Sequence, residues 1–326
     1  MVSFRLLPPF LLAPLAAALL SFDAAGAEYP SRPVRIVLGF GAGGPDTTAR
    51  ILAQQLAAQT KQTFVVDNRP GANGIIAADI VAKATPDGHT LLYTSGSFVV
   101  NPSVRKKLPY DTVKDFTPVS QLTEGEAHIV VVNPSLPVRN VKELIELVRK
   151  PGSKLAYGSP GVGNTIHMAT AVFAARTGAN MVHVPYKGAG PALTALVAGE
   201  IQVMFATAPL GMPHITAGRV RAIAYNGAKR ASFLPDVPTM IESGVTGTDM
   251  PPSWHGLLAP AKLPPAVLAK LSGEIRKAFK NPPMRQRIEA VRLAPIGGAP
   301  EEFRKLVISN IKRFAELVKL AGVEPE

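Results

Sequence analysis

The sequence of 326 residues contains no cysteine and a single tryptophan, and aromatic residues make up only 6% of it. The absence of cysteine excludes a disulfide scaffold, a thiol nucleophile, a cysteine-based zinc or redox site and a lipid anchor on cysteine. The scarcity of aromatic rings leaves no stacking platform for nucleic acid. Any chemistry of this chain must therefore use oxygen, nitrogen and backbone groups.

Several catalytic and metal-binding motifs are also missing. The six histidines show no HxxxH or HxH pairing, so a metal site has no support in the sequence. Tyr157 stands where a nucleophile elbow around Ser159 would need glycine. Pro45 and Asp46 follow Gly44 where a P-loop would need lysine and serine or threonine. The sequence therefore indicates no catalysis and no metal.

The composition that is present belongs to a folded protein. Hydrophobic residues make up 47% of the chain and charged residues 18%, which is enough to bury a sizeable core. Lys and Arg number 35 against 23 Asp and Glu, a formal net charge of +12. The basic residues are dispersed in short groups, which does not favour nucleic acid. A positive field that attracts an anionic small molecule is the better interpretation.

The first 27 residues are typical of a secretory signal peptide. Arg5 precedes an apolar run from Leu6 to Leu20, and Ala25-Gly26-Ala27 forms an A-x-A cleavage signature. The alternative, a membrane anchor, needs about 20 unbroken apolar residues, whereas three prolines interrupt this run and Asp23 ends it. We expect cleavage after Ala27, which leaves the net charge at +12, and export of the mature chain.

Alternating strands and helices predict two α/β lobes, each with a mostly parallel sheet flanked by helices and with a site between the lobes. A proline-rich connection over 101–118 separates the two sets of elements. Apolar runs predict strands at 34–38, 63–66, 89–94, 129–132, 155–157, 181–184, 202–205, 221–225 and 254–259. Helical spacing predicts helices at 48–58, 75–84, 141–149, 165–176, 191–198, 265–279, 283–290 and 300–320.

A glycine-rich loop follows the first strand. Residues 39–44 match GxGxxG, and Asp67 ends the next strand, which is the layout of a dinucleotide site with its ribose carboxylate. More generally, glycines at a helix N-terminus bring N–H groups toward any anion, either a phosphate or a carboxylate. A secreted NAD-dependent oxidoreductase is therefore the alternative function. Export as an unfolded chain argues against it, because the cofactor would have to be found outside the cytoplasm.

Other loops offer polar groups at corresponding positions. The turn Thr94-Ser95-Gly96-Ser97 follows the third strand and either completes an anion site or caps a helix. In the second lobe the loop from Ser159 to Asn164 plays the same part, and His167 either donates to a carboxylate or packs in the core. Asp46 either caps the following helix or faces the ligand.

Seven ordered motifs resemble those of the tripartite tricarboxylate transporter solute-receptor family, also called the Bug family. They are Tyr29-Pro30-Ser31-Arg32-Pro33-Val34-Arg35-Ile36, Asp67-Asn68-Arg69-Pro70-Gly71-Ala72, Thr85-Pro86-Asp87-Gly88-His89-Thr90-Leu91-Leu92, Leu108-Pro109-Tyr110-Asp111, His183-Val184-Pro185-Tyr186-Lys187-Gly188, Leu234-Pro235-Asp236-Val237-Pro238-Thr239 and Trp254-His255-Gly256-Leu257-Leu258-Ala259-Pro260. The resemblance covers essentially the whole chain after the signal peptide. It implies a periplasmic binding protein of the two-lobed, type II Venus-flytrap kind.

The resemblance also implies which residues grip the ligand, largely through backbone N–H groups, hydroxyls and water. They are Phe40, Gly41, Ala42, Gly43, Gly44, Asp46, Thr47, Thr94, Ser95, Gly96, Ser97, Ser159, Gly163, Asn164, Thr165, His167, Tyr186, Gly188, Ala206 and Thr207. The first loop departs from the family's usual Pro-Pro-Gly-Gly pattern and is one residue shorter. Ala206-Thr207-Ala208 stands where many relatives carry Asp or Ser. The ligand therefore cannot be copied from a relative.

The sequence thus predicts a periplasmic, monomeric, non-enzymatic receptor for a small organic anion. We expect a mono- or dicarboxylate, aromatic acids included, delivered to the membrane subunits of a tripartite tricarboxylate-type transporter, with no cofactor, metal or nucleic acid. Residues 28–124 and 256–326 are predicted to form the first lobe and residues 125–255 the second. The strand at 254–259 returns the chain to the first lobe, so two segments cross between the lobes.

Overall fold

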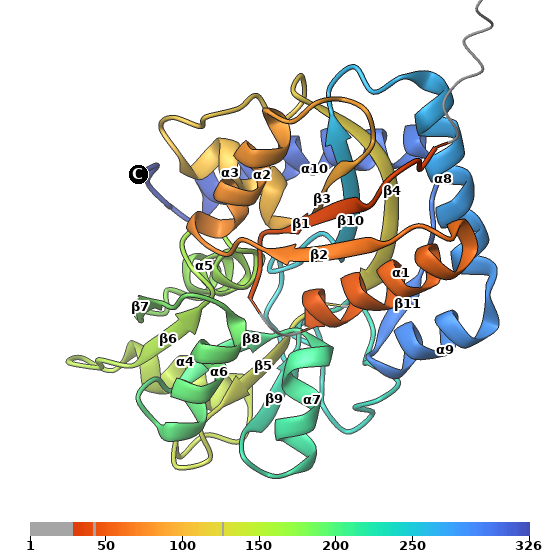
Figure 1. Cartoon of the computed structure of the whole chain (residues 1–326). Coiled ribbons are helices and arrows are strands. Elements are labelled where there is room, and N and C mark those ends of the chain that lie inside the picture. The colour runs from red at the N-terminus through yellow and green to blue at the C-terminus, as the bar shows by residue number, and fades with distance from the viewer. Residues whose placement is uncertain (1–28, 42–43, 126) are drawn as a thin grey trace, which may run out of the picture.

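The computed structural model describes residues 29–41, 44–125 and 127–326, which form two α/β lobes (Figure 1). The predicted signal peptide lies outside the described residues, and so do Ala42 and Gly43 of the predicted site. Among the helices of the described ranges, none is long and apolar enough to span a bilayer.

A six-stranded sheet, in the order β11-β4-β10-β3-β1-β2, forms the centre of lobe 1. The central strand β1 is a largely β-branched and aliphatic run that is mostly buried on both faces, as expected for a sheet covered by helices on both sides. The strands are β1 (Val34–Leu38), β2 (Phe64–Asn68), β3 (Thr90–Ser95), β4 (Phe116–Gly125), β10 (Ser253–Pro260) and β11 (Leu293–Pro295).

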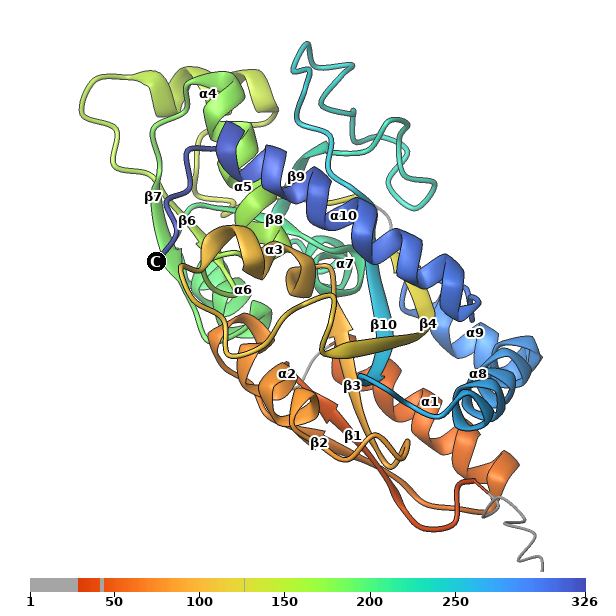
Figure 2. The same ribbon diagram turned by 90° about the horizontal axis from the view of Figure 1, so that it is seen from above.

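Helices cover both faces of this sheet, and each face has its own apolar core. One face carries α1 (Gly44–Thr60), α8 (Pro265–Lys280) and α9 (Pro282–Ala290), and the other carries α2 (Ile75–Ala82), α3 (Ser97–Val104) and α10 (Pro300–Leu320), with a short 3-10 turn η1 (Ala72–Gly74) before α2. Figure 2 shows α10 running along the molecule from beside α9 to beside α5. On that face Trp254 of β10 meets the ring of Phe303 edge to face at 5.3 Å.

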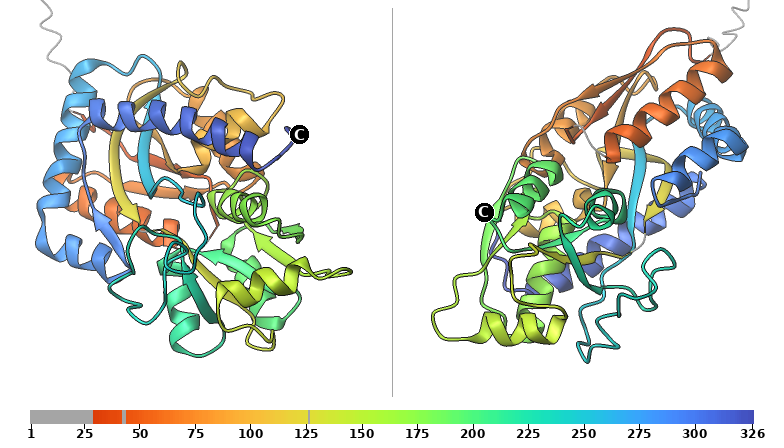
Figure 3. Two further views of the ribbon diagram at one scale, coloured as in Figure 1. Left: turned by 180° about the vertical axis from the view of Figure 1, so that it is seen from behind. Right: turned by 90° about the horizontal axis from the view of Figure 1, so that it is seen from below.

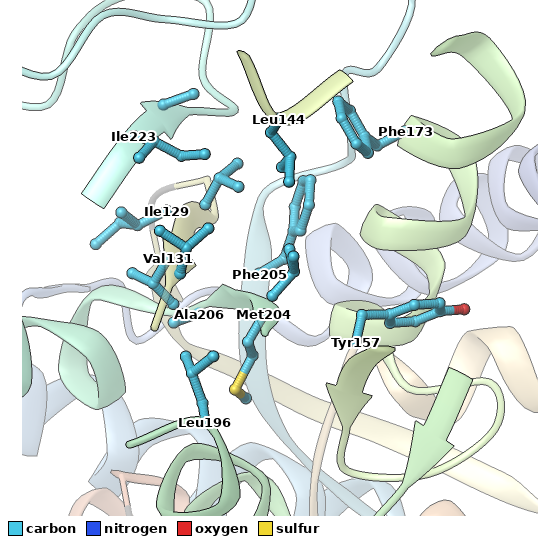
Figure 4. Packing of buried hydrophobic residues seen from close by; sticks show 14 of the residues in the cluster. Ile129, Val131, Leu144, Tyr157, Phe173, Leu196, Met204, Phe205, Ala206 and Ile223 are labelled. Atoms are coloured by element: carbon cyan, nitrogen blue, oxygen red, sulfur yellow. The ribbon is translucent and has the colours of Figure 1, made fainter. Parts of the chain in front are cut away.

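Lobe 2 is built around a five-stranded sheet in the order β7-β6-β8-β5-β9. Its elements are β5 (Ile129–Val132), α4 (Val141–Arg149), β6 (Ala156–Ser159), α5 (Thr165–Thr177), β7 (Val182–Pro185), α6 (Ala189–Ala198), β8 (Val203–Ala206), α7 (Ala208–Thr216) and β9 (Arg221–Tyr225). Val131, Phe173 and Phe205 are fully buried in its core, which Figure 4 shows from close by.

The two-lobed α/β fold confirms the prediction, but the sheets are mixed instead of mostly parallel. In lobe 1, β10 lies antiparallel between β3 and β4. In lobe 2, β5 lies antiparallel between β8 and β9. Each inserted strand begins where the chain has just crossed from the other lobe, so it enters its sheet from the opposite end. The lobe boundaries at 124/125 and 255/256 remain predictions, although β10 already begins at Ser253.

Besides the 3-10 turn η1, four elements were not predicted from the sequence: α3, β4, α7 and β11. Pro102 lies inside α3 and Pro213 inside α7, where proline normally argues against a helix. Each proline lies past the first turn and lacks the N–H that a helix interior uses, so neither segment has an uninterrupted helical pattern. β11 has only three residues, too few for a periodic pattern.

A third contact joins the lobes besides the two chain crossings. Helix α5 of lobe 2 packs against α10 of lobe 1, as the view from behind in Figure 3 shows. Met168 and Val172 of α5 are fully buried in the same apolar cluster as Phe98 of α3 and Phe314 of α10. The two lobes therefore share part of one core.

Candidate functional site

The predicted site residues lie at turns that lead from a strand into a helix. In lobe 1 these turns open α1 at Gly44 and α3 at Ser97, and in lobe 2 they open α5 at Thr165, α6 at Ala189 and α7 at Ala208. The first N–H groups of a helix have no partner within it and form its partially positive end. Turns of this kind from both lobes therefore supply donors suited to an anion.

Asp46 in the first turn of α1 ties this helix to the end of β2. Its carboxylate accepts from Asn68 Nδ2 at 2.8 Å and from Arg50 Nε at 2.9 Å. Asn68 Nδ2 also donates to the carbonyl of Phe40 at 3.0 Å. Burial raises the pKa of Asp46, but the hydrogen bonds from Arg50 and Asn68 outweigh it and hold this pKa below its usual value. These contacts join Phe40 and the first turn of α1 to the end of β2; a ligand contact for Asp46 stays a prediction.

The turn between β3 and α3 is held by its own hydroxyls. Ser95 Oγ accepts from the N–H of Ser97 at 3.3 Å, in the manner of a turn that opens a helix. Thr94 and Ser97 are buried, whereas Ser95 is partly exposed. Ser95 is therefore the hydroxyl of this turn that remains accessible to a ligand.

Ser159, at the end of β6, is completely buried and its hydroxyl is engaged. It lies 2.7 Å from Nε2 of His183 and accepts from the N–H of Gly161 at 3.2 Å. The backbone carbonyl of Ser159 accepts from the N–H of Tyr186 at 2.8 Å. Within the described contacts Ser159 thus shapes the loop, and the ligand contact predicted for its hydroxyl stays untested.

His167 stacks on His183, with ring centroids 4.1 Å apart, and His183 in turn stacks on Tyr157 at 4.8 Å. His167 Nδ1 accepts from the N–H of Gly163 at 3.3 Å. Burial lowers the pKa of His167 to about 3 and that of His183 to about 4, so both rings are neutral near pH 7. His167 therefore belongs to the packed ring stack that supports the glycine loop of lobe 2.

The start of α5 touches the start of α3 directly. Asn164 Oδ1 accepts from the N–H of Ile166 at 2.9 Å and so caps α5. Asn164 Nδ2 donates to Ser97 Oγ at 3.0 Å across the lobe boundary. A Cβ added to Gly96 would lie 3.2 Å from a methyl carbon of Thr165. The structure thus brings these predicted residues together as a lobe-to-lobe contact.

Two asparagines extend this contact. Asn73 adopts a left-handed backbone conformation with φ of 55°, which asparagine tolerates better than most residues. Its side chain donates to Asn101 Oδ1 at 2.8 Å and accepts from Asn164 Nδ2 at 3.5 Å. Gly163 packs here as well, since a Cβ on it would meet Val104 at 2.4 Å.

The remaining predicted residues are spread along the boundary. A Cβ on Gly44 would lie 3.6 Å from Cβ of Pro209 at the start of α7, so α1 and α7 approach each other there. Thr207 immediately precedes α7 and is partly exposed, and Gly188 precedes α6. The side chain of Ala206, in contrast, is fully buried in the core of lobe 2.

Asp67, the ribose ligand of the dinucleotide alternative, is occupied by two cations. Arg35 Nε donates to it at 2.8 Å, and Arg69 Nε lies 3.0 Å from its other oxygen. Burial raises the pKa of Asp67, but hydrogen bonds from Arg35 and Arg69 outweigh it and lower that pKa. A ribose would have to displace these partners, which disfavours the dinucleotide interpretation.

Within 29–41, 44–125 and 127–326, there is no group of three or more His, Cys, Asp or Glu that could hold a metal ion. A groove of about 440 Å³ lies between α1 and β2, lined by residues such as Gln54 and Phe64. This groove is on the outside of lobe 1 and contains none of the predicted site residues.

Residues 48–323 match the family described as the tripartite tricarboxylate transporter family receptor. The chain belongs to this family. Membership confirms the resemblance stated from the sequence motifs. The proteins of this family bind solutes, and this chain is therefore a solute receptor.

Solved structures of similar proteins agree with this membership. The periplasmic binding protein BugD is 33% identical, with a TM-score of 0.85 over 91% of this chain and 100% of that one. Rpa4515 of R. palustris, solved with adipate, is 32% identical, with a TM-score of 0.87 over 92% of this chain and 100% of that one. MatC of Rhodopseudomonas palustris, solved with malate, is 30% identical, with a TM-score of 0.83 over 89% and 100%.

Sequence reasoning missed several residues that shape the receptor's lobe boundary. Asn101 falls in the predicted proline-rich connection and Asn73 in no predicted element, and no sequence pattern joins them to Asn164. His183 could have been found, since it opens the motif His183-Val184-Pro185-Tyr186 on which the resemblance rests. Its stacking on His167 depends on the pairing of β6 with β7, which the sequence does not reveal.

Proposed function

We propose that this protein is a monomeric, non-enzymatic periplasmic receptor that captures a small organic carboxylate between its lobes. It would then deliver the ligand to the membrane subunits of a tripartite tricarboxylate-type transporter. The predicted signal peptide would direct export and would be removed by cleavage after Ala27. The observation that carries the proposal is the meeting of strand-to-helix turns from both lobes, at Gly44 and Pro209 and at Ser97 and Asn164.

The chemistry of these turns supports a carboxylate. A carboxylate taken out of water needs several donors to offset its desolvation, and N–H groups and hydroxyls at helix starts provide them without a counter-charge. The net charge of +12 favours the approach of an anion. The similar proteins Rpa4515 and MatC were solved with the dicarboxylates adipate and malate.

Thermal-shift and calorimetric titrations of residues 28–326 test this function. The screen contains aliphatic mono- and dicarboxylates, hydroxy acids, benzoate, benzene-1,4-dicarboxylate and NAD(H). We expect one class of acid to raise the melting temperature and to bind with 1:1 stoichiometry. Stabilisation by NAD(H) alone, or by none of the acids, would overturn the proposal. Delivery is tested with proteoliposomes that contain the transporter's membrane subunits. These should take up the bound acid only when the receptor is added.

A further inference from the structure

His255 lies on β10, the strand that brings the chain back into lobe 1, between two strands of the site. It pairs with Ser95 at the end of β3 on one side and with Thr123 of β4 on the other. Its neighbours Trp254 and Gly256 are buried, whereas His255 is only partly buried. An ionisable ring therefore stands at a partly exposed point beside the accessible hydroxyl of Ser95.

Contacts of the ring place it on the α1 side of the sheet. Its centroid is 5.5 Å from that of Tyr93, which is fully buried in the core formed with α1. The hydroxyl of Tyr93 is hydrogen-bonded to Thr48 Oγ1, and the Thr48 hydroxyl donates to the carbonyl of Pro45 at 3.0 Å. His255 is thus connected through Tyr93 to the first turn of α1, where the proposed carboxylate site begins.

Thr123 determines which ring nitrogen of His255 carries the proton. Thr123 is buried, and its Oγ1 lies 2.9 Å from His255 Nδ1. A buried hydroxyl needs an acceptor for its proton, and Nδ1 is the partner that the described structure gives it. Nδ1 is therefore the acceptor and Nε2, at the tip of the ring, carries the hydrogen. Among the described residues Nε2 has no hydrogen-bond partner of its own.

Burial lowers the pKa of His255 to about 4, so the ring is neutral near pH 7. A neutral Nε2–H is a donor with no competing acceptor character at that atom. Such a group donates a hydrogen bond to an oxygen of the ligand but forms no hydrogen bond with a methylene or methyl group.

We propose that His255 is a specificity-determining residue whose Nε2–H donates to a second oxygen of the ligand. The first carboxylate would be held at the helix starts, and His255 would select acids that carry a further carboxylate or hydroxyl oxygen over acids with an apolar tail. This inference rests on the proposed function and names its ligand class as dicarboxylates and hydroxy acids.

The test compares acids matched in chain length by calorimetry: adipate with hexanoate, and succinate with butyrate. The wild-type protein is expected to prefer at least one diacid over its monoacid. His255→Ala should lower that preference by about 10- to 100-fold, the range for one hydrogen bond to a charged group, and change monoacid affinity less than twofold. His255→Gln, which keeps a donor, should retain part of the preference.

His214→Ala provides the control, since His214 lies in the last turn of α7. This variant should keep the wild-type preference. The inference is overturned if a folded His255→Ala protein keeps the preference for the diacid, or if the wild type binds both members of each pair equally. Either result leaves the proposed function standing. A wild type that binds none of the four acids overturns the inference, and one that in addition binds no acid of the wider screen overturns the proposed function.

Discussion

The side-chain amide of Asn164 makes one hydrogen bond within its own lobe and one to the other lobe. Its oxygen accepts from the N–H of Ile166 at 2.9 Å, and its nitrogen donates to Ser97 Oγ at 3.0 Å in the other lobe. The residue that begins α5 thus also joins the lobes.

Replacement of this amide should affect both stability and binding. Asn164→Ala should lower the free energy of unfolding by about 1–2 kcal/mol for the lost cap and about 1 kcal/mol more for the lost interlobe bond. Ser97→Ala removes only the interlobe bond. Both variants should bind a stabilising acid about 5- to 10-fold more weakly, because the bond between the lobes forms only when the lobes meet. Urea unfolding and calorimetry measure the two effects.

Asn140→Ala is the matched control for this experiment. Asn140 caps α4 by accepting from the N–H of Glu143 at 3.0 Å. Its loss should cost about 1 kcal/mol of stability and leave affinity unchanged. Equal losses of affinity in Asn140→Ala and Asn164→Ala would show that the interlobe bond has no part in binding.

Gly44→Val should abolish binding without unfolding the protein. A Cβ at this position reaches 3.6 Å from Pro209, so the additional methyl groups of valine would occupy the space between α1 and α7. We expect affinity for a stabilising acid to fall at least 100-fold, since backbone N–H groups at a helix start need close approach. Gly273→Val is the control, because a Cβ on Gly273 meets no atom within 4 Å. Wild-type affinity in Gly44→Val would remove this turn from the site.

Ser159→Ala and Ser95→Ala should separate support of the site from contact with the ligand. Ser159→Ala leaves His183 Nε2 without its partner and should lower stability by about 1–3 kcal/mol. Ser95→Ala removes a partly exposed hydroxyl and should mainly weaken acid binding, by about 1–3 kcal/mol. Melting curves and titrations of both variants measure this. Reversed effects, with Ser95 important for stability and Ser159 for affinity alone, would contradict the assignment.

Stability should fall as the pH is lowered from about 6.5 toward 4. Burial lowers the pKa of His128 and of His183 to about 4, below the value of about 6.5 in an unfolded chain. Between these two values the unfolded state binds more protons than the folded state, so each ring contributes a loss of up to about 1.4 kcal/mol per pH unit.

His128→Leu tests this linkage. Both ring nitrogens of His128 are buried without a hydrogen-bond partner, so leucine can replace the ring without breaking a hydrogen bond among the described residues. Urea unfolding at pH 7 and pH 5 should show a smaller difference in the variant than in the wild type. Carboxylates contribute equally to both proteins and cancel. An unchanged difference would mean that His128 does not take part.

Local patterns predicted many elements well. The structure gives β1, β5, β9, α4 and α10 the bounds expected from the sequence. In these segments the signals agree: β-branched runs form the strands, Asn140 caps α4 and Pro300 occupies the first turn of α10. The order of strands could not be predicted, because β10 enters between β3 and β4 only after the chain has crossed lobe 2.

In the candidate site, too, the local turns could be predicted but the contacts between distant residues could not. Its turns were found because glycine and hydroxyl residues follow apolar strands at positions such as Ser95 and Gly163. The contacts that hold these turns were not found, because Asn73 and Asn164 are 91 positions apart and His183 reaches His167 through strand pairing. Helix α7 was missed because Pro209 and Pro213 obscure its periodicity.

The shared core between α5 and α10 restricts how the lobes can move relative to each other. Met168 and Val172 would be exposed to water if the lobes parted on that side, at a cost of about 25 cal/mol for each Å² of apolar surface. The boundary between α1 and α7, where Gly44 faces Pro209, has no such seal among the described contacts. A motion that keeps α5 packed on α10 therefore exposes the least apolar surface, and a solute would enter from the side of α1 and α7.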